Sequence, residues 1–146
     1  MARAFAIEDG NQNSPTVTSA KSITYKDIDL AFKAKPSGEI FKKEEAAAVK
    51  QAVKNILMTN FMEKPFDDTF GGNLNDFLFE LDTSIEADIL RDRIFETVAR
   101  HEPRALMRGV DILVNSDTNE VRVSVTFQVQ NAVEPVTLEL DLTRVR

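Results

Sequence analysis

The hydrophobic pattern of this chain changes its period at Pro103. Before this proline, apolar residues recur at spacings of three and four, as on one face of a helix: Ala87, Leu90, Ile94 and Val98. After it, apolar and polar residues alternate, as on a half-buried strand. Because proline cannot continue a helix, a helix that begins near Thr83, with Glu86 completing a capping box, must end by about His101. The chain is therefore divided into a helical part and a β part at this corner.

Three strands are expected after Pro103. The second has valine or phenylalanine at every other position from Val121 to Val129, and the last repeats the pattern from Val136 to Leu142. The first shows it in Leu106, Val110, Ile112 and Val114. One apolar and one polar face predict an antiparallel meander with helices on its apolar side. We therefore predict an α+β fold: a single domain whose antiparallel sheet is covered on one face by two to three helices.

The first third of the chain is less regular. Residues 1–22 are polar and have no apolar period, which predicts a flexible N-terminal arm in front of a folded domain at 23–146. An extended segment is expected from Ile23 to just before Pro36. An apolar stripe predicts a helix over 43–58, with acidic residues in its first turn: Glu44 and Glu45.

Residues 59–73 predict an ordered loop, because Pro65 and the Gly71-Gly72 pair interrupt any regular element. Three aromatic residues of this loop need a surface to cover them: Phe61, Phe66 and Phe70. A short helix is expected to follow over 74–81.

Composition removes several classes of function. The 146 residues contain no cysteine and one histidine, His101, so disulfides, thiolate chemistry and transition-metal sites are not expected. Eighteen basic against 24 acidic residues give a net charge of −6, which argues against binding nucleic acid or an anionic membrane. With neither a long apolar stretch nor a secretory signal, the protein is expected to stay where it is made. No cofactor motif is present, since Gly71-Gly72 lacks the lysine and hydroxyl residue of a phosphate loop.

Acidic residues suggest one enzymatic hypothesis, glycoside hydrolysis, which needs two carboxyl groups with one kept protonated. Candidate pairs are Glu80 with Asp82, and Glu96 with Glu102. In a chain with 24 acids such pairs arise readily, so solvated helix faces and caps are the favoured explanation. His101 is explained by its place at a helix C-terminus.

Arginines and acids are unevenly distributed along the chain. Residues 65–90 contain seven acids and no lysine or arginine, and residues 91–108 contain five arginines. A docking surface and pairing within the molecule explain this asymmetry equally well.

The tripeptide Glu102-Pro103-Arg104 stands where the period changes. In an extended chain residues two apart face the same side, so the two charged side chains are expected to project together. One interpretation is an internal salt bridge that closes the corner. The other is a clasp in which the guanidinium binds a carboxylate or backbone carbonyls of another chain.

Features spread over residues 23–146 resemble those of a known family. They are Tyr25-Lys26-Asp27-Ile28-Asp29, the aliphatic helix at 49–57, the loop from Pro65 to Phe70-Gly71, and Glu102-Pro103-Arg104 before a β-rich C-terminus. In this order they are similar to the small baseplate wedge proteins of contractile phage tails, also called sheath initiators and historically tail lysozymes. Glu-Pro-Arg is the specific part of the match. The chain departs from the family at 60–64, where a basic Gly-Glu-Arg-type stretch is usual.

The resemblance implies a structural protein without cofactor, located in the baseplate of the virion and assembled in the host cytoplasm. It implies that Glu102, Pro103 and Arg104 bind the helical core bundle of the wedge, and that the sheet offers the first sheath ring an edge to join. The implied partners are wedge core-bundle subunits and the first ring of sheath protein, with tail tube or hub proteins as further candidates. An edge strand has unpaired backbone groups that can accept a strand of another chain.

Two alternatives stay open beside this hypothesis. One is a peptidoglycan-cleaving tail lysozyme that uses an acid such as Glu80, Glu96 or Glu102. The other is a free adaptor protein of the same fold, because a fold alone does not determine function.

Overall fold

The computed structural model describes residues 25–77, 84–115, 120–130 and 132–143. Its elements are, in chain order, β1 (Lys26–Ile28), β2 (Lys42–Glu44), α2 (Ala46–Met58), α3 (Leu74–Phe77), α4 (Ser84–His101), β3 (Ala105–Asn115), β4 (Glu120–Val129) and β5 (Pro135–Thr143). The predicted arm at 1–22 lies outside the described residues, as do Glu80, Asp82 and the Thr83 cap. None of the described helices combines the length and the apolar character needed to cross a membrane.

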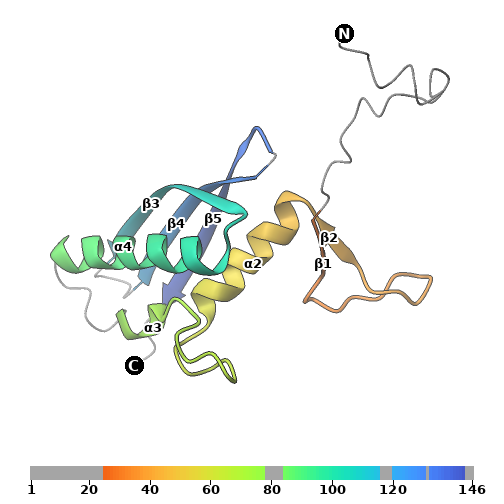
Figure 1. Ribbon diagram of the computed structural model, residues 1–146, viewed down its shortest axis with the longest axis horizontal. Coiled ribbons are helices and arrows are strands. Elements are labelled where there is room, and N and C mark those ends of the chain that lie inside the picture. The colour runs from red at the N-terminus through yellow and green to blue at the C-terminus, as the bar shows by residue number, and fades with distance from the viewer. Residues whose placement is uncertain (1–24, 78–83, 116–119, 131, 144–146) are drawn as a thin grey trace, which may run out of the picture.

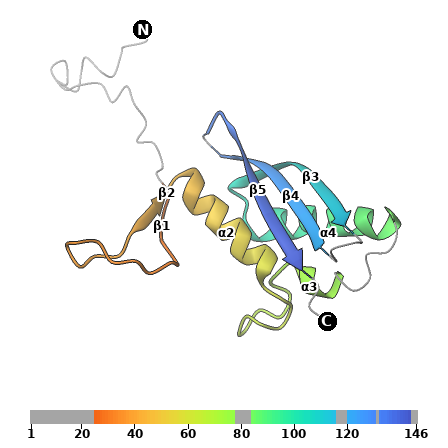
Figure 2. The ribbon, with the colours of Figure 1, turned by 180° about the vertical axis from the view of Figure 1, so that it is seen from behind.

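The predicted α+β fold is confirmed. Strands β3, β4 and β5 form an antiparallel sheet in that order, and β1 pairs with β2 in a separate small sheet. Helix α4 lies across one face of the larger sheet, next to β3, and α2 contacts both α4 and β5 (Figure 1). Seen from behind, the opposite face of the sheet carries no described helix (Figure 2). The polar side chains predicted for this face, such as Arg122 and Asp141, form a cross-strand ion pair at 2.6 Å.

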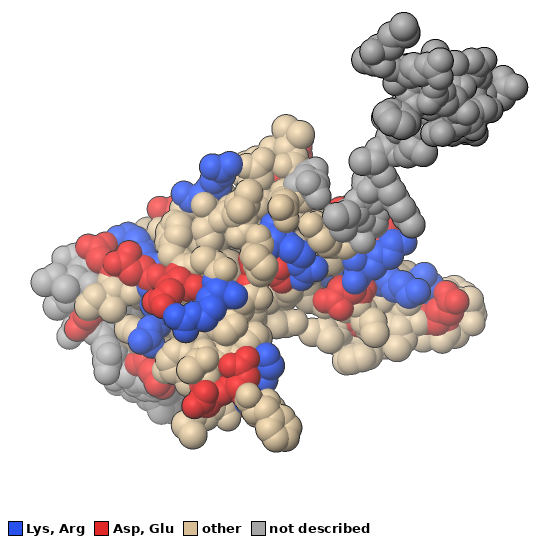
Figure 3. All heavy atoms as spheres, in the orientation of Figure 1, with Lys and Arg blue, Asp and Glu red and all other residues tan. Residues whose placement is uncertain are grey.

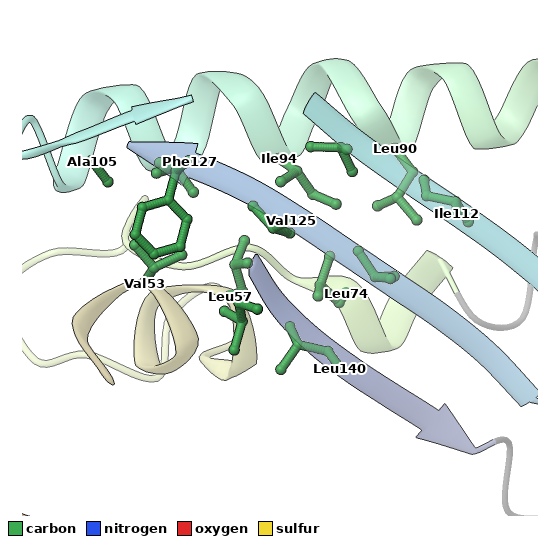
Figure 4. Close-up of a cluster of buried hydrophobic side chains, with 14 of the residues drawn as sticks. Val53, Leu57, Leu74, Leu90, Ile94, Ala105, Ile112, Val125, Phe127 and Leu140 are labelled. Carbon is green, nitrogen blue, oxygen red and sulfur yellow. The ribbon is translucent and has the colours of Figure 1, made fainter. Parts of the chain in front are cut away.

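The core lies between this sheet and the two long helices. Figure 4 shows Val53 and Leu57 of α2 and Leu90 and Ile94 of α4 converging on the sheet residue Phe127 and its neighbours. Every odd-numbered residue of β4 is buried, as the alternation predicts: Val121, Val123, Val125, Phe127 and Val129. Each such side chain contributes about 1.5–3 kcal/mol through the removal of apolar surface from water.

A β-bulge shifts the inward face of β3. Met107 is opposite Phe127 and Gly109 is opposite Thr126, so Arg108 is an extra residue in the ladder. The prediction that Leu106 points into the core is therefore wrong, and its side chain is 49% exposed. Val110 and Ile112, beyond the bulge, are buried as predicted, but Val114, near the end of the strand, is 46% exposed.

Helix α2 begins three residues later than predicted. Lys42–Glu44 pairs with β1, and Glu45 has a φ of 50°, which no helical residue adopts. The helix starts at Ala46, so Glu44 and Glu45 do not form its first turn. The hairpin lobe, defined as residues 26–44, projects away from the sheet beyond the start of α2 (Figure 1). Within the described residues, the predicted extended segment is thus reduced to the three residues of β1 and a single bridge residue, Ala34, which pairs with Ile40.

The loop at 59–73 is ordered because its two ends meet. Gly72 N donates to the carbonyl oxygens of Ile56 (2.9 Å) and Thr59 (3.1 Å). Gly71 has a φ of +123°, and a Cβ there would lie 2.3 Å from the Thr59 oxygen, so only glycine allows this approach. Phe70 packs edge-on against a histidine, but Phe66 is fully exposed, contrary to the expectation that a surface covers it.

Candidate docking site at the Pro103 corner

Backbone hydrogen bonds close the corner between α4 and β3. Glu102 N donates to Val98 O at 2.8 Å, which completes the last turn of α4, and Ala105 N donates to Glu102 O at 3.0 Å across Pro103. The second bond spans three residues, so residues 102–105 form a tight turn. The extended conformation expected around Pro103 is therefore replaced by a turn.

Glu102 and Arg104 bind each other across this turn. Arg104 Nε donates to Glu102 Oε1 and Nη2 donates to Oε2, both at 2.5 Å. Such a two-bond pair is the strongest geometry available to a guanidinium and a carboxylate. The two side chains do lie together, as predicted, but Glu102 faces inward: the residue is only 4% exposed.

Arg104 is the part of the corner that reaches solvent. Its side chain is 36% exposed, and its guanidinium carbon lies 5.1 Å from the centre of the Tyr25 ring. Hydrogen bonding to Glu102 raises the pKa of Arg104, and the nearby Glu102 charge acts in the same direction. No hydrogen bond from Nη1 of Arg104 is found among the described residues. That nitrogen can donate to a carboxylate or carbonyl of another chain.

The acids nominated for catalysis are engaged elsewhere. Glu96 Oε1 accepts from Arg100 Nη2 at 2.6 Å on the exposed side of α4, and Glu102 is held by Arg104. An ion pair favours the ionised form of a carboxyl group, whereas a general acid needs an apolar setting that keeps its carboxyl group protonated. Glu80 lies outside the described residues.

A cavity of about 320 Å³ lies between α4 and the loop at 59–73. Glu96 and His101 line it together with Phe61 and Arg93. The His101 ring packs against Phe70 with the ring centres 4.9 Å apart, which supports the structural interpretation of this histidine. Within the described ranges no group of three or more His, Asp or Glu side chains could hold a metal ion.

The arginines of 91–108 are engaged with other parts of the same molecule. Arg91 pairs with Asp88 and Arg100 with Glu96 along α4, where acidic and basic side chains alternate on the surface (Figure 3). Arg93 lies over the rings of two aromatic residues, Phe61 and Phe77, at 5.2 and 5.0 Å. Pairing within the molecule thus accounts for several of these arginines.

The larger sheet has an edge at β3 and another at β5, and neither has a further neighbouring strand among the described residues. Gln130 N donates to Arg104 O at 2.8 Å, so this residue, just after β4, faces β3. Backbone groups alternate in direction along an antiparallel strand. The odd-numbered residues of β4 therefore direct their backbone N–H and C=O groups toward β5. In β5, the odd-numbered residues from Thr137 onward direct theirs away from β4, at the open edge of the sheet.

Comparisons with known proteins identify what this arrangement is similar to. The family model described as baseplate wedge protein gp25 matches residues 43–133. The baseplate wedge protein gp25 of Enterobacteria phage T4 is 29% identical over 119 residues, which are 80% of this chain and 90% of that protein.

Solved structures agree with these sequence matches. A chain in the cryo-EM structure of the anti-feeding prophage (AFP) baseplate superposes with a TM-score of 0.66 at 26% identity, over 76% of this chain and 90% of that one. A protein of Geobacter sulfurreducens described as a candidate tail lysozyme has a TM-score of 0.59 at 15% identity, covering 67% and 89%. At that identity the likeness is one of fold alone.

Proposed function

This chain belongs to the family of baseplate wedge protein gp25, whose members are structural components of contractile tail baseplates, and we propose that it docks on the wedge through Arg104 and initiates polymerisation of the tail sheath. In this proposal the Pro103 corner binds the core bundle of the wedge. An open edge of the larger sheet then pairs with a strand of the first sheath ring. The observation that carries the docking step is the partly exposed guanidinium held in place by a buried carboxylate.

The chemistry of docking follows from the N–H groups of Arg104 that Glu102 leaves without a partner. Because Glu102 occupies Nε and Nη2, the guanidinium plane is fixed before any partner arrives, and little side-chain entropy remains to be lost on binding. Nη1, which has no hydrogen-bond partner among the described residues, then donates to a carbonyl or carboxylate of the core bundle. Glu102 acts as the group that positions Arg104.

Strand pairing follows from the two open edges. Outward N–H and C=O groups give affinity through backbone hydrogen bonds, whatever the side chains of the incoming strand. The polar outer face, with Arg122 and Asp141 paired, keeps the rest of the sheet soluble before assembly.

The docking claim is tested with Arg104→Lys in an otherwise unchanged chain. Lysine keeps the positive charge beside Glu102 but lacks the planar fork that can bind two partners at once. The variant is expected to fold with a nearly unchanged circular dichroism spectrum and to leave wedges unassembled. Arg100→Lys is the matched control, since Arg100 binds a carboxylate on the exposed side of α4. Normal wedge assembly by Arg104→Lys contradicts the proposal.

The enzymatic alternative has its own test. The purified protein is added to a suspension of bacterial cell walls, and turbidity is followed with time. A structural role predicts no change. If the protein clears the suspension, and if Glu96→Gln or Glu102→Gln abolishes this clearing, the result would instead support cleavage of peptidoglycan.

A further inference from the structure

A groove of about 530 Å³ lies beside the outer edge of β5. Its walls come from three parts of the chain: the hairpin lobe, α2 and β5 itself. Apolar atoms of Leu30, Ala47 and Leu138 line it together with three lysines, Lys43, Lys50 and Lys54. The volume is within the range of sites that hold ligands, about 300–1,000 Å³.

The charge of the groove differs from that of the whole protein. Its lining has three lysines against two acids, Asp29 and Glu139, so it is positive, whereas the chain carries a net charge of −6. Lys43 is paired with Asp29 at 3.3 Å. Within the described part of the chain, Lys54 has no carboxylate partner. Helix α2 contains two lysines and no acid, so the positive charge of this wall is not neutralised from its own helix.

Lys50 connects the groove to the edge of the sheet. Its Nζ donates to the carbonyl oxygen of Thr137 at 2.7 Å. Thr137 is one of the β5 residues whose backbone groups point away from β4. The ammonium of this α2 lysine thus occupies an acceptor that a neighbouring strand would otherwise use.

We propose that this groove receives an extended, acidic segment of a neighbouring tail protein, which adds to β5 as a fourth strand. The proposal rests on the strand pairing proposed above and specifies both the edge and the chemistry of the incoming strand. A backbone N–H of the segment replaces Lys50 at the Thr137 carbonyl. Carboxylates of the segment then bind Lys50 and Lys54, and its apolar side chains cover Leu30, which is 48% exposed.

The other edge is less suited to this role. The ladder of β3 is interrupted by the bulge at Arg108, a feature that discourages pairing at an edge. Its regular part, 110–115, carries exposed apolar side chains at Leu113 and Val114 and is therefore the competing edge.

Two proline variants separate the edges. Glu139→Pro removes an outward N–H of β5, and Val114→Pro removes one of β3, and neither residue donates to β4. Glu139→Ala controls for the side chain, and thermal melting confirms that each variant is folded. Tails are then assembled with each variant, and the ratio of sheath to baseplate is measured by electron microscopy and gel densitometry. Glu139→Pro is expected to reduce the ratio by at least about tenfold, and Val114→Pro to leave it unchanged.

A charge reversal tests the acidic character of the segment. Lys54→Glu is expected to lower sheath assembly by on the order of tenfold, and Lys33→Glu, an exposed lysine of the hairpin lobe outside the groove, to have no effect. If only Val114→Pro blocks the sheath, the β5 groove is refuted while strand pairing stands. If neither proline variant has an effect, strand pairing itself is refuted. If Glu139→Pro blocks assembly but Lys54→Glu does not, the segment is not acidic and the inference fails.

Discussion

Arg104 binds Glu102 through two parallel hydrogen bonds of 2.5 Å, and the carboxylate they join is buried. A buried charge is stable only when it is paired and hydrogen-bonded, because removal from water disfavours the ionised form. The folded state therefore depends on Arg104 even before a partner is present. Stability and docking must be measured separately at this corner.

Replacing Arg104 with alanine is expected to destabilise the protein by about 2–3 kcal/mol, because the Glu102 carboxylate loses both donors. Arg104→Lys should cost about 1 kcal/mol, since the charge remains. Urea unfolding followed by circular dichroism measures both free energies.

The double variant Glu102→Gln with Arg104→Ala is the control for this prediction. With the buried charge removed as well, much of the loss should be recovered, and the cycle of single and double variants gives the coupling energy. A coupling near zero would mean that the pair contributes nothing to stability.

The core is expected to tolerate truncation far less than the loop at 59–73. Phe127→Ala removes a fully buried ring opposite the bulge of β3 and should cost about 3–5 kcal/mol. Phe66→Ala removes a ring of the same size that touches solvent on every side and should change stability by less than about 0.5 kcal/mol. Chemical denaturation of the two variants tests the difference, and equal losses would show that Phe66 is buried in solution.

The elements predicted best are those with a clean period. Helix α4 and strands β4 and β5 agree with prediction to within a residue or two, because burial on one face forces apolar residues to recur at the period of the backbone. The bulge at Arg108 could not be predicted, since one extra residue changes the face of Leu106 without changing the alternation nearby. The late start of α2 depends on Glu45 in a conformation that its residue type does not signal.

The candidate site was predicted in composition but not in geometry. The sequence places Glu102 and Arg104 two residues apart, and a turn and an extended strand both bring such side chains together. Which of them is buried depends on the packing of α4 against β3, which no local pattern encodes. The groove beside β5 was missed because its lining comes from segments about 90 residues apart, Lys50 and Leu138 among them.

Gly71 is predicted to be irreplaceable in the loop closure. In Gly71→Ala the new Cβ meets the Thr59 carbonyl oxygen at 2.3 Å in a left-handed backbone conformation, so the loop must move or the end of α2 must unravel. A loss of about 3 kcal/mol or more is expected in thermal unfolding. Gly109→Ala is the matched control, because a Cβ at Gly109 meets no atom within 4 Å. Similar melting temperatures for the two variants would contradict the close approach.

Acid should weaken the internal structure of the hairpin lobe. Asp29 accepts a hydrogen bond from Ala31 N at 3.1 Å and lies 3.3 Å from Lys43 Nζ, and these contacts, the first being the larger, lower the pKa of Asp29. A carboxyl group with a lowered pKa stabilises the folded state above its unfolded pKa of about 3.9, and this contribution disappears as the pH falls through the lower folded value.

Titration of the Asp29 carboxyl by NMR should therefore give a midpoint below that of the same residue in an unstructured peptide. Asp29→Asn should remove this part of the acid dependence of stability. A midpoint equal to or above the peptide value would show that the contacts with Ala31 and Lys43 are absent in solution.

The hairpin lobe is predicted to be held to the body by Gln51. Its amide donates to Ile28 O at 2.8 Å and to Asp27 at 3.3 Å, although the residue lies on the buried side of α2. A two-stranded hairpin of this length is not stable alone, so loss of these bonds should open it locally. In Gln51→Ala, amide hydrogen exchange should accelerate by at least about tenfold over residues 26–44 and remain unchanged in β4. Lys50→Ala, at the residue just before Gln51 on α2, should leave exchange in the lobe unchanged. Equal acceleration in both variants would mean that α2 as a whole, and not Gln51, holds the lobe.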